Sequence, residues 1–188
     1  MKRVVLGVSG ASGAALARDC GEILSAAGVA VDLVISPAAE KTFELELGPQ
    51  ALGELRERVE RVHDIRDMGA TIASGSYRVE GMIVVPCSMR SLSAISIGLD
   101  DNLLTRAASV QLKERRKLVL LTREAPLSLA HLRAMTSVTE MGGIILPPVP
   151  AFYLKPASVA AITRQIAGRA VDVLGVAPPQ AEAWGGVN

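Results

Sequence analysis

Five short apolar runs, each followed by a longer stretch with helical periodicity, are the feature that most constrains how this chain folds. The runs are nearly continuous in valine, isoleucine and leucine, which is typical of strands covered on both faces. Strands separated by helices need right-handed crossovers, and these produce a parallel sheet. The expected strands are 4–8, 29–35, 82–85, 118–121 and 144–146, and the expected helices are 13–26, 37–46, 50–61, 90–97, 101–115, 127–140 and 157–173.

This alternation predicts a single-domain α/β fold with a doubly wound parallel sheet of about five strands in a three-layer αβα arrangement. Helix start signals support the helix positions, namely Pro37 after Ser36, Asp100 ahead of one helix and Ser158 ahead of the last. We expect the domain to span residues 1–175. The tail, 176–188, is rich in proline, glycine and alanine, contains the only tryptophan, Trp184, and is expected to lack regular structure.

The charge balance argues against several classes of partner. Lys and Arg number 20 against 19 Asp and Glu, so the chain lacks the basic excess that favours nucleic acid or a membrane surface. No apolar run approaches the roughly 18 residues that a membrane-spanning helix needs. The two cysteines, Cys20 and Cys87, lie far apart and without metal-ligand spacing. We therefore expect a cytoplasmic protein with reduced thiols and no metal site.

The segment "GVSGASGA" follows the first expected strand, at the sheet edge where ligands bind in such folds. Its glycines permit a tight turn and close helix packing, and the amides of the following helix N-terminus also suit a phosphate. The spacing G-x-x-G-x-x-G differs from the dinucleotide fingerprint, and no acid ends the second strand, because Asp32 lies inside it. A dinucleotide is therefore disfavoured, whereas a mononucleotide such as FMN fits.

Charged residues near the fourth strand are the next candidates. Arg123 and Glu124 follow that strand directly, where an arginine suits phosphate and a glutamate can move protons. Arg106 and Lys113 are seven residues apart on one expected helix, so they face the same way, either toward an anion or toward solvent. The basic run 115–117 is interpreted as a solvated helix end.

Other polar residues carry weaker signals. Glu46 has the pattern of a surface helix acid, and Tyr153 is equally consistent with a buried plug or with a hydroxyl facing a ligand. His63, expected in a linker, and His131, expected on a helix, lack a nucleophile at motif spacing and are interpreted as non-catalytic. Nothing beside Cys87 marks an activated thiolate.

Five segments together resemble the flavin prenyltransferases of the UbiX/Pad1 type. They are "GASGA" at 10–14, "ASGSY" at 73–77, "PCSMRSLS" at 86–93, the long block "DNLLTRAASVQLKERRKLVLLTREAPLSLAHLRAM" at 101–135, and "GGIILPPVPAFY" at 142–153. The resemblance runs in order over nearly the whole chain. It implies a flavodoxin-like (Rossmann-like) fold and a transferase that needs no metal ion.

The resemblance also implies the reaction and its partners. The enzymes of this family move a dimethylallyl group from dimethylallyl monophosphate to N5 and C6 of reduced FMN. The product, prenylated FMN, is the cofactor of UbiD-type decarboxylases. Family members assemble into large homo-oligomers, typically dodecamers, with active sites at subunit interfaces, and the tail at 176–188 is expected to pack near the flavin or a neighbouring subunit.

The site residues implied by the resemblance fall into three groups. FMN contacts are expected from Gly10, Ala11, Ser12, Ser36, Ser88, Met89, Arg90, Ser91, Arg106 and Arg123. The prenyl phosphate is expected to meet Lys113, Arg123, Glu124, Tyr153 and Arg169, of which the three cations and the phenol stand in for a metal ion. Catalytic roles are expected for Ser12, Glu46, Lys113 and Glu124, with Ser12 and Glu124 holding the released phosphate as a proton relay.

Two departures from the family pattern occur. Leu154 stands where the family usually has histidine, and Ser109 stands where aspartate is common. Two other functions suit the same fold, namely an FMN-dependent cysteine-type decarboxylase and an FMN-carrying accessory subunit without catalysis. The decarboxylases require a catalytic histidine and an Asn/Met-rich clamp, neither of which is evident in this sequence.

Overall fold

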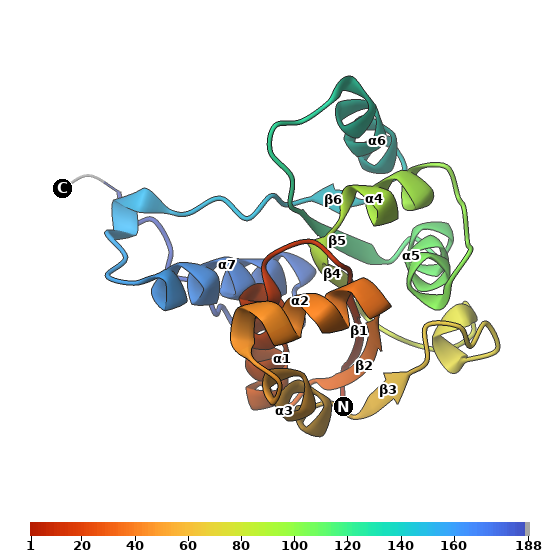
Figure 1. The fold of residues 1–188 in the computed structure, drawn as a ribbon, viewed down its shortest axis with the longest axis horizontal. Coiled ribbons are helices and arrows are strands. Elements are labelled where there is room, and N and C mark those ends of the chain that lie inside the picture. The colour runs from red at the N-terminus through yellow and green to blue at the C-terminus, as the bar shows by residue number, and fades with distance from the viewer. Residues whose placement is uncertain (187–188) are drawn as a thin grey trace.

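Six parallel strands form one sheet in the order β3-β2-β1-β4-β5-β6 in the computed structural model, which describes residues 1–186 (Figure 1). Strand pairing is in register over β1 and β2, where Arg3 lies opposite Ala30 and Val8 opposite Ile35. The carboxyl ends of all six strands therefore meet at one edge. The strands are β1 (Arg3–Val8), β2 (Ala30–Ile35), β3 (Arg61–His63), β4 (Gly81–Cys87), β5 (Lys117–Thr122) and β6 (Ile144–Ile145).

Helices cover both faces of the sheet and produce the expected three layers. Side chains alternate between the two faces along each strand, so Val4, Leu6 and Leu33 belong to one apolar cluster, whereas Val5 and Val34 belong to the other. One apolar cluster joins the sheet to α1 (Ala14–Ala26), α2 (Pro37–Leu47), α3 (Ala51–Arg58) and α7 (Val159–Leu174). The other joins it to α4 (Met89–Ser96), α5 (Leu103–Lys113), α6 (Leu129–Glu140) and the short 3-10 turn Thr71–Ala73. A second 3-10 turn, Phe152–Leu154, lies outside both clusters.

The structure corrects three expectations. The sheet has six strands rather than about five, because Arg61–His63 pairs with β2 although the sequence predicted a helix through residue 61. His63 is therefore part of an edge strand and not of a linker. The helix after residue 100 is capped by Asn102, whose side chain accepts from Thr105 N at 3.1 Å, and not by Asp100.

Asp32 explains why the polar strand β3 joins the sheet. Its carboxylate is completely buried and accepts from Arg3 Nη1 at 3.3 Å and from the Tyr77 hydroxyl at 3.0 Å. The Nε2 atom of His63 lies 3.0 Å from the other carboxylate oxygen. Since a buried carboxylate needs such partners, Asp32 holds together β1, β3 and the loop that carries Tyr77.

We expect Asp32→Asn to lower the free energy of unfolding by about 3 kcal/mol, because an amide cannot accept from all three partners and two buried donors lose their acceptor. Urea unfolding monitored by circular dichroism measures the change. Asp64→Asn is the matched control, because the Asp64 side chain is 55% exposed. A loss no larger than that of the control would contradict the structural role of Asp32.

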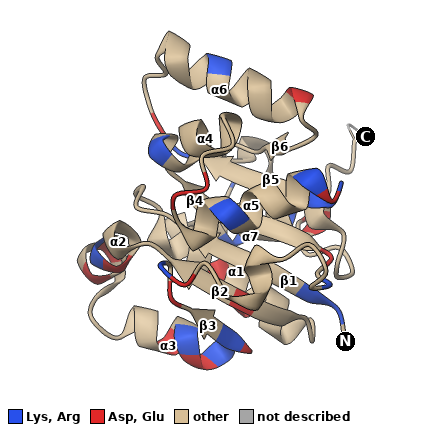
Figure 2. Cartoon of the chain, turned by 90° about the vertical axis from the view of Figure 1, so that its right-hand side faces the viewer, with Lys and Arg blue, Asp and Glu red and all other residues tan. Residues whose placement is uncertain are grey.

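Acidic and basic residues are interspersed along the ribbon in Figure 2, with both signs side by side on α3. The nearly balanced charge of the chain agrees with this distribution. Within residues 1–186, no helix combines the length and apolar character needed to cross a membrane.

Candidate active site

Three loops at the carboxyl edge of the sheet are tied together by backbone and hydroxyl hydrogen bonds. Ser9, after β1, donates its hydroxyl to Pro86 O at 2.9 Å and accepts from Ser88 N at 2.7 Å. Arg123 N, after β5, donates to Cys87 O at 3.1 Å. The loops after β1, β4 and β5 are therefore fixed relative to one another. Ser9 is not predicted from the sequence, since neither its residue type nor its spacing from the glycines distinguishes it from Ser12.

Ser12, Arg123 and Glu46 meet where α1 begins. The Nε atom of Arg123 donates to Ser12 O at 3.1 Å, which joins two strand-end loops 111 residues apart in sequence. The Glu46 carboxylate, from α2, accepts from Gly13 N at 2.9 Å and from Ala14 N at 2.8 Å. The N-terminus of a helix attracts anions, so this carboxylate lies where the unpaired amides of α1 need an acceptor. Glu46 is thus part of the loop cluster and not an ordinary surface acid.

Gly10 packs directly against the start of α2. A Cβ atom at this position would lie 2.3 Å from the Ala38 Cβ, so only glycine fits without a shift of the backbone. Gly13 has a φ of 122°, a conformation that glycine tolerates. Ser36 caps α2, and its hydroxyl accepts from Ala39 N at 3.2 Å. The packing interpretation therefore holds for Gly10 and Gly13, and the same packing brings Gly10, Ala11 and Ser36 to one edge.

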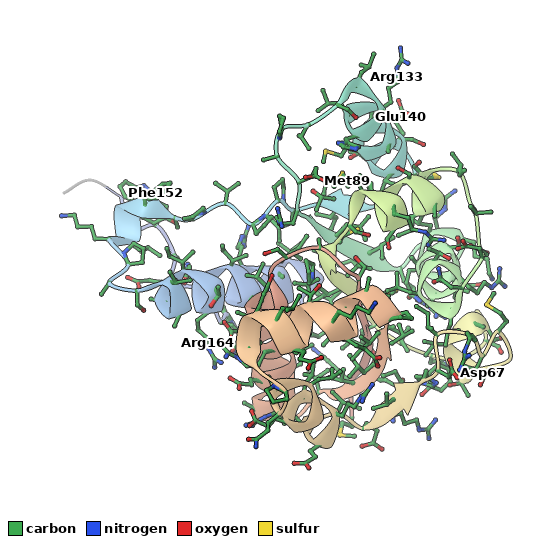
Figure 3. The ribbon with its side chains drawn as sticks, in the orientation of Figure 1. Asp67, Met89, Arg133, Glu140, Phe152 and Arg164 are labelled. Carbon is green, nitrogen blue, oxygen red and sulfur yellow. The ribbon has the colours of Figure 1, made fainter. Side chains whose placement is uncertain are left out.

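The segment Ser88–Ser91 forms the start of α4. The Ser88 hydroxyl accepts from Ser91 N at 3.3 Å and donates to the Ser91 hydroxyl at 3.2 Å. Met89, labelled in Figure 3, is buried in the apolar cluster beneath α4. Arg90 is exposed and forms an ion pair with Asp101. The helix N-terminus and its hydroxyls therefore face the same edge as the loop after β1, with Arg90 turned toward its acidic partner.

Glu124 is exposed beside Arg123, and its Oε1 atom accepts from Ala125 N at 3.1 Å. Nothing else among the described residues engages this carboxylate by a hydrogen bond. The carboxylate is therefore exposed directly after the end of β5, with a single backbone amide as its hydrogen-bond partner.

Tyr153 and Arg169 lie on a second part of the molecule, beside α7. The arm, which we define as residues 146–158, reaches away from the sheet toward the C-terminal segment (Figure 1). Tyr153, Arg169 and Trp184 line a cavity of about 500 Å³. The Tyr153 and Trp184 rings meet edge to face with centroids 4.9 Å apart. The structure therefore brings together two of the five predicted phosphate residues and the tail tryptophan.

Arg106 and Lys113 do not join either group within one chain. Arg106 donates to Asp100 and to Ala73 O, each at 3.1 Å. Lys113 ends α5 beside Glu114, four residues before β5 begins, and so lies at the amino edge of the sheet. The two residues share a helix as expected, but their side-chain hydrogen bonds go to Ala73, Asp100 and Glu114 and not to the loops after β1, β4 and β5.

A further cavity of about 470 Å³ lies at the carboxyl ends of β2 and β3, where His63 and Arg56 line it. It contains none of the predicted site residues. Cys87 is also outside any reactive arrangement, because burial raises the pKa of its thiol to about 12.

Residues 1–169 match the family model described as Flavoprotein. A probable UbiX-like flavin prenyltransferase of Bacillus subtilis is 47% identical over 99% of this chain and 91% of its own length. Flavin prenyltransferase UbiX of Neisseria meningitidis is 45% identical over 100% of this chain and 98% of its own. The chain belongs to the UbiX/Pad1 family of flavin prenyltransferases. A mitochondrial member from Saccharomyces cerevisiae, PAD1, is 44% identical over 100% of this chain and 77% of its own length.

Solved members of the UbiX/Pad1 family have the same fold. AnUbiX (PadA1), in complex with FMN and dimethylallyl pyrophosphate, superposes with a TM-score of 0.94 at 44% identity and covers 100% of this chain and 99% of its own. A dodecameric FMN-dependent UbiX-like decarboxylase of Escherichia coli O157:H7 gives a TM-score of 0.92 at 41% identity, over 98% and 100% of the two chains. The peptidyl-cysteine decarboxylase EpiD, at 15% identity and a TM-score of 0.61, shares the fold alone.

The environment of Glu46 predicts a pH effect on the stability of this family member. Partial burial raises the pKa of Glu46, but the Ser12 hydroxyl, the Gly13 and Ala14 amides and Arg123 outweigh it and hold the pKa below its usual 4.5. A carboxyl with a lowered pKa in the folded state stabilises the fold above its unfolded pKa, and this contribution is lost as the pH falls through the folded pKa.

We therefore expect Glu46→Gln to melt at a lower temperature than the wild type at pH 7, with the difference shrinking below about pH 4.5. Thermal unfolding over a pH series measures the gap. Glu44→Gln, on the same helix, is the control and should show no such convergence. A gap that stays constant with pH would show that the Glu46 charge does not stabilise α1.

Proposed function

We propose that this protein is a flavin prenyltransferase that joins the dimethylallyl group of dimethylallyl monophosphate to N5 and C6 of reduced FMN. The observation that carries the proposal is the contact of Ser12, Glu46 and Arg123 at the start of α1. These residues come from three different segments. The family resemblance implies Ser12 and Arg123 as flavin contacts and Glu46 as a catalytic acid. Relatives that are 44–49% identical over most of the chain carry the same activity in their names.

The residues at the carboxyl edge fit FMN. Helices α2 and α4 begin at this edge, where Ser36 and Ser88 are their N-cap residues. The hydroxyls and free amides of such helix N-termini suit a phosphate and a polar ribityl chain. Gly10, which has no side chain, packs against the start of α2 beside these hydroxyls. Bound reduced FMN supplies the nucleophilic N5 and C6 atoms of the reaction. Ala11, Met89, Arg90 and Ser91 complete the proposed flavin contacts.

Positive charge assists the departure of the prenyl phosphate. Breaking the C1–O bond of the donor leaves the electron pair on phosphate, and Arg123 at the mouth of the loops stabilises that charge. Tyr153 and Arg169, in the cavity beside α7, are proposed to hold the same phosphate. Within residues 1–186, no group of three or more His, Cys, Asp and Glu residues suits a metal ion.

Three residues are proposed to handle the proton released from flavin C6. Glu124 is the acceptor within reach of the loop cluster, and the released phosphate, held by Ser12 and Glu124, relays the proton. The hydrogen bonds from the α1 amides lower the pKa of Glu46 and favour its ionised form, so Glu46 suits steering a proton by its negative charge and not donating one. Ser12 thus contributes both to flavin binding and to proton transfer.

The separation of Lys113 from the loop cluster supports active sites shared between subunits. Lys113 is the last residue of α5, at the amino edge of the sheet, whereas the other predicted phosphate residues lie elsewhere in the same chain. A homo-oligomer, proposed to be a dodecamer, would bring Lys113 and Arg106 of one copy to the loops of another. The solved UbiX-like protein of Escherichia coli O157:H7, which is dodecameric, is consistent with such an assembly.

Mixed oligomers test this sharing. We expect Lys113→Ala and Glu124→Gln to be nearly inactive alone but to recover roughly a quarter of wild-type activity when co-expressed in equal amounts. Half of the copies keep Glu124, and half of the neighbouring copies keep Lys113, so about one site in four is intact. Recovery at the background level would place both residues in one chain's site.

Mass spectrometry tests the activity itself. The purified protein is incubated without oxygen with reduced FMN and dimethylallyl monophosphate, and the flavin is then weighed. A flavin heavier by one C5H8 unit supports the transferase. An unchanged flavin on FMN-loaded protein would contradict it and would favour a carrier of FMN, and loss of CO2 from a cysteine-ended peptide would favour the decarboxylase.

The product is proposed to serve a UbiD-type decarboxylase. Adding this protein, reduced FMN and the donor to an inactive UbiD-type apoenzyme should restore decarboxylation. The same mixture without the donor is the control.

A further inference from the structure

The strap, which we define as residues 176–184, follows a fixed path along α7 although it has no regular secondary structure. Gln180 N donates to Asp172 Oδ1 at 2.7 Å, and Ala181 N donates to Asp172 Oδ2 at 3.0 Å. The amide of Gln165 pairs in both directions with the backbone of Glu182, each bond being 2.9 Å long. Four hydrogen bonds from two side chains of α7 therefore hold three consecutive strap residues.

Gly168 lets the strap lie this close to the helix. A Cβ atom on Gly168 would be 3.1 Å from the carbonyl carbon and oxygen of Gln180 and 3.2 Å from Ala181 N. These are backbone atoms, so a larger side chain at 168 cannot be accommodated by a rotamer change. Gln165, Gly168 and Asp172 are spaced three and four residues apart and share one face of α7.

The strap forms one wall of the Tyr153–Arg169 cavity. Pro179, Ala181 and Trp184 line the cavity together with those two residues. Trp184 follows the last held residue by two positions, and its ring meets the Tyr153 ring edge to face. Figure 3 shows Phe152, the neighbour of Tyr153, at the outer end of the arm beside the C-terminal segment. The strap and the arm thus close the cavity from two sides.

Asp172 has a second consequence for Arg169. The two residues are three apart on α7, a spacing at which opposite charges pair. With the strap in place, both carboxylate oxygens of Asp172 accept from strap amides. If the strap leaves, the Asp172 carboxylate is free to pair with Arg169 and to withdraw that guanidinium from an anion in the cavity.

We propose that Asp172 and Gln165 are positioning residues for the prenyl donor. They hold the strap so that Trp184 covers the Tyr153–Arg169 cavity and Asp172 does not compete for Arg169. The inference rests on the proposed function for its substrate, a short allylic monophosphate, but the docking of the strap is independent of turnover. Gln165 and Asp172 also line the cavity, but their side-chain hydrogen bonds go to the strap, so they act on the donor by holding the strap in place.

The chain's only tryptophan lies in the strap, which permits a test without catalysis. We expect Gly168→Val to lower the fluorescence anisotropy of Trp184, because the displaced strap lets the indole rotate. Ala160→Val, at an exposed position near the start of α7, is the control and should leave the anisotropy unchanged. Equal anisotropy in wild type and Gly168→Val would overturn the docking of the strap.

Kinetics then test positioning. We expect Gly168→Val to raise the KM for dimethylallyl monophosphate about tenfold with kcat nearly unchanged at saturating donor, since the strap preorganises the binding site. Gln165→Glu, which keeps an acceptor but not the amide donor, should show a smaller rise than Gln165→Ala. Adding Asp172→Ala to Gly168→Val should lower the KM again, because Arg169 loses its competitor.

The outcomes separate this inference from the proposed function. If the protein prenylates no flavin but Gly168→Val still lowers the anisotropy, the proposed function is refuted and the docking of the strap on α7 is supported. An active protein whose KM is unaffected by Gly168→Val refutes positioning. A double variant with a KM equal to or above that of Gly168→Val refutes the competition for Arg169.

Discussion

Glu124→Gln is expected to bind FMN as tightly as the wild type and to slow formation of the second flavin bond, at C6, by a factor of about 10²–10⁴. Glutamine has nearly the same shape as glutamate, so the contact with Ala125 N and the position beside Arg123 are retained. An amide cannot accept the proton that leaves flavin C6, however, and the second bond to the flavin then lacks its base. Forming the second bond leaves the mass of the flavin adduct unchanged, so the absorbance of the flavin in single-turnover experiments measures the rate of this step, and a flavin titration measures the binding.

Glu57→Gln is the matched control for this experiment, because Glu57 is an exposed glutamate on α3, away from the strand-end loops. It should leave both the rate and the binding unchanged. Full prenylation activity in Glu124→Gln would remove this carboxylate from the proton path. Loss of FMN would show instead that Glu124 supports the flavin site.

Gly10→Ala is expected to abolish detectable FMN binding while the protein remains folded. The added methyl would lie 2.3 Å from the Ala38 Cβ and within 3.3 Å of the Ala38 backbone, and no flexible side chain can move aside. The loop after β1 and the start of α2 must separate, at a cost of about 1–3 kcal/mol, and Ser36 and Glu46 move with α2. Isothermal titration with FMN measures the loss, and circular dichroism measures the fold.

Gly53→Ala controls for the general effect of replacing a glycine. Gly53 lies on α3 with nothing within 4 Å of a Cβ atom, so alanine should fit there and favour the helix. Wild-type affinity for FMN in Gly10→Ala would show that the loop after β1 has room to adapt and that its close packing on α2 is not needed for the flavin.

The apolar runs predicted most of the fold. The five expected strands are present with ends that differ by one or two residues, because a strand buried on both faces is apolar throughout. β3 was missed for the opposite reason. Its residues, Arg61–His63, are polar and partly exposed, and they join the sheet through the pairing with β2 and the contact of His63 with Asp32. No local sequence pattern predicts a strand that depends on a carboxylate distant in the sequence.

The sequence predicted those residues of the candidate site whose positions are determined by the ends of the strands. The loops after β1, β4 and β5 meet at one edge because parallel strands share a direction, so Ser12, Ser88 and Arg123 were expected together. Glu46 was recognised only through the family resemblance, since its contact with the α1 amides depends on how α2 packs. The roles of Gln165 and Asp172 depend on the path of the strap, which its composition leaves undefined.

The lengths of the outermost strands affect how this protein behaves at high concentration. β3 has three residues and β6 has two, whereas the four inner strands have six or seven. A long, free edge would offer a row of backbone amides and carbonyls on which a strand from another molecule can add. Here each outer strand offers very few such groups, so sheet-to-sheet growth has no extended template. A chain that is 49% apolar is thereby protected from the aggregation that its own strand sequences would otherwise favour.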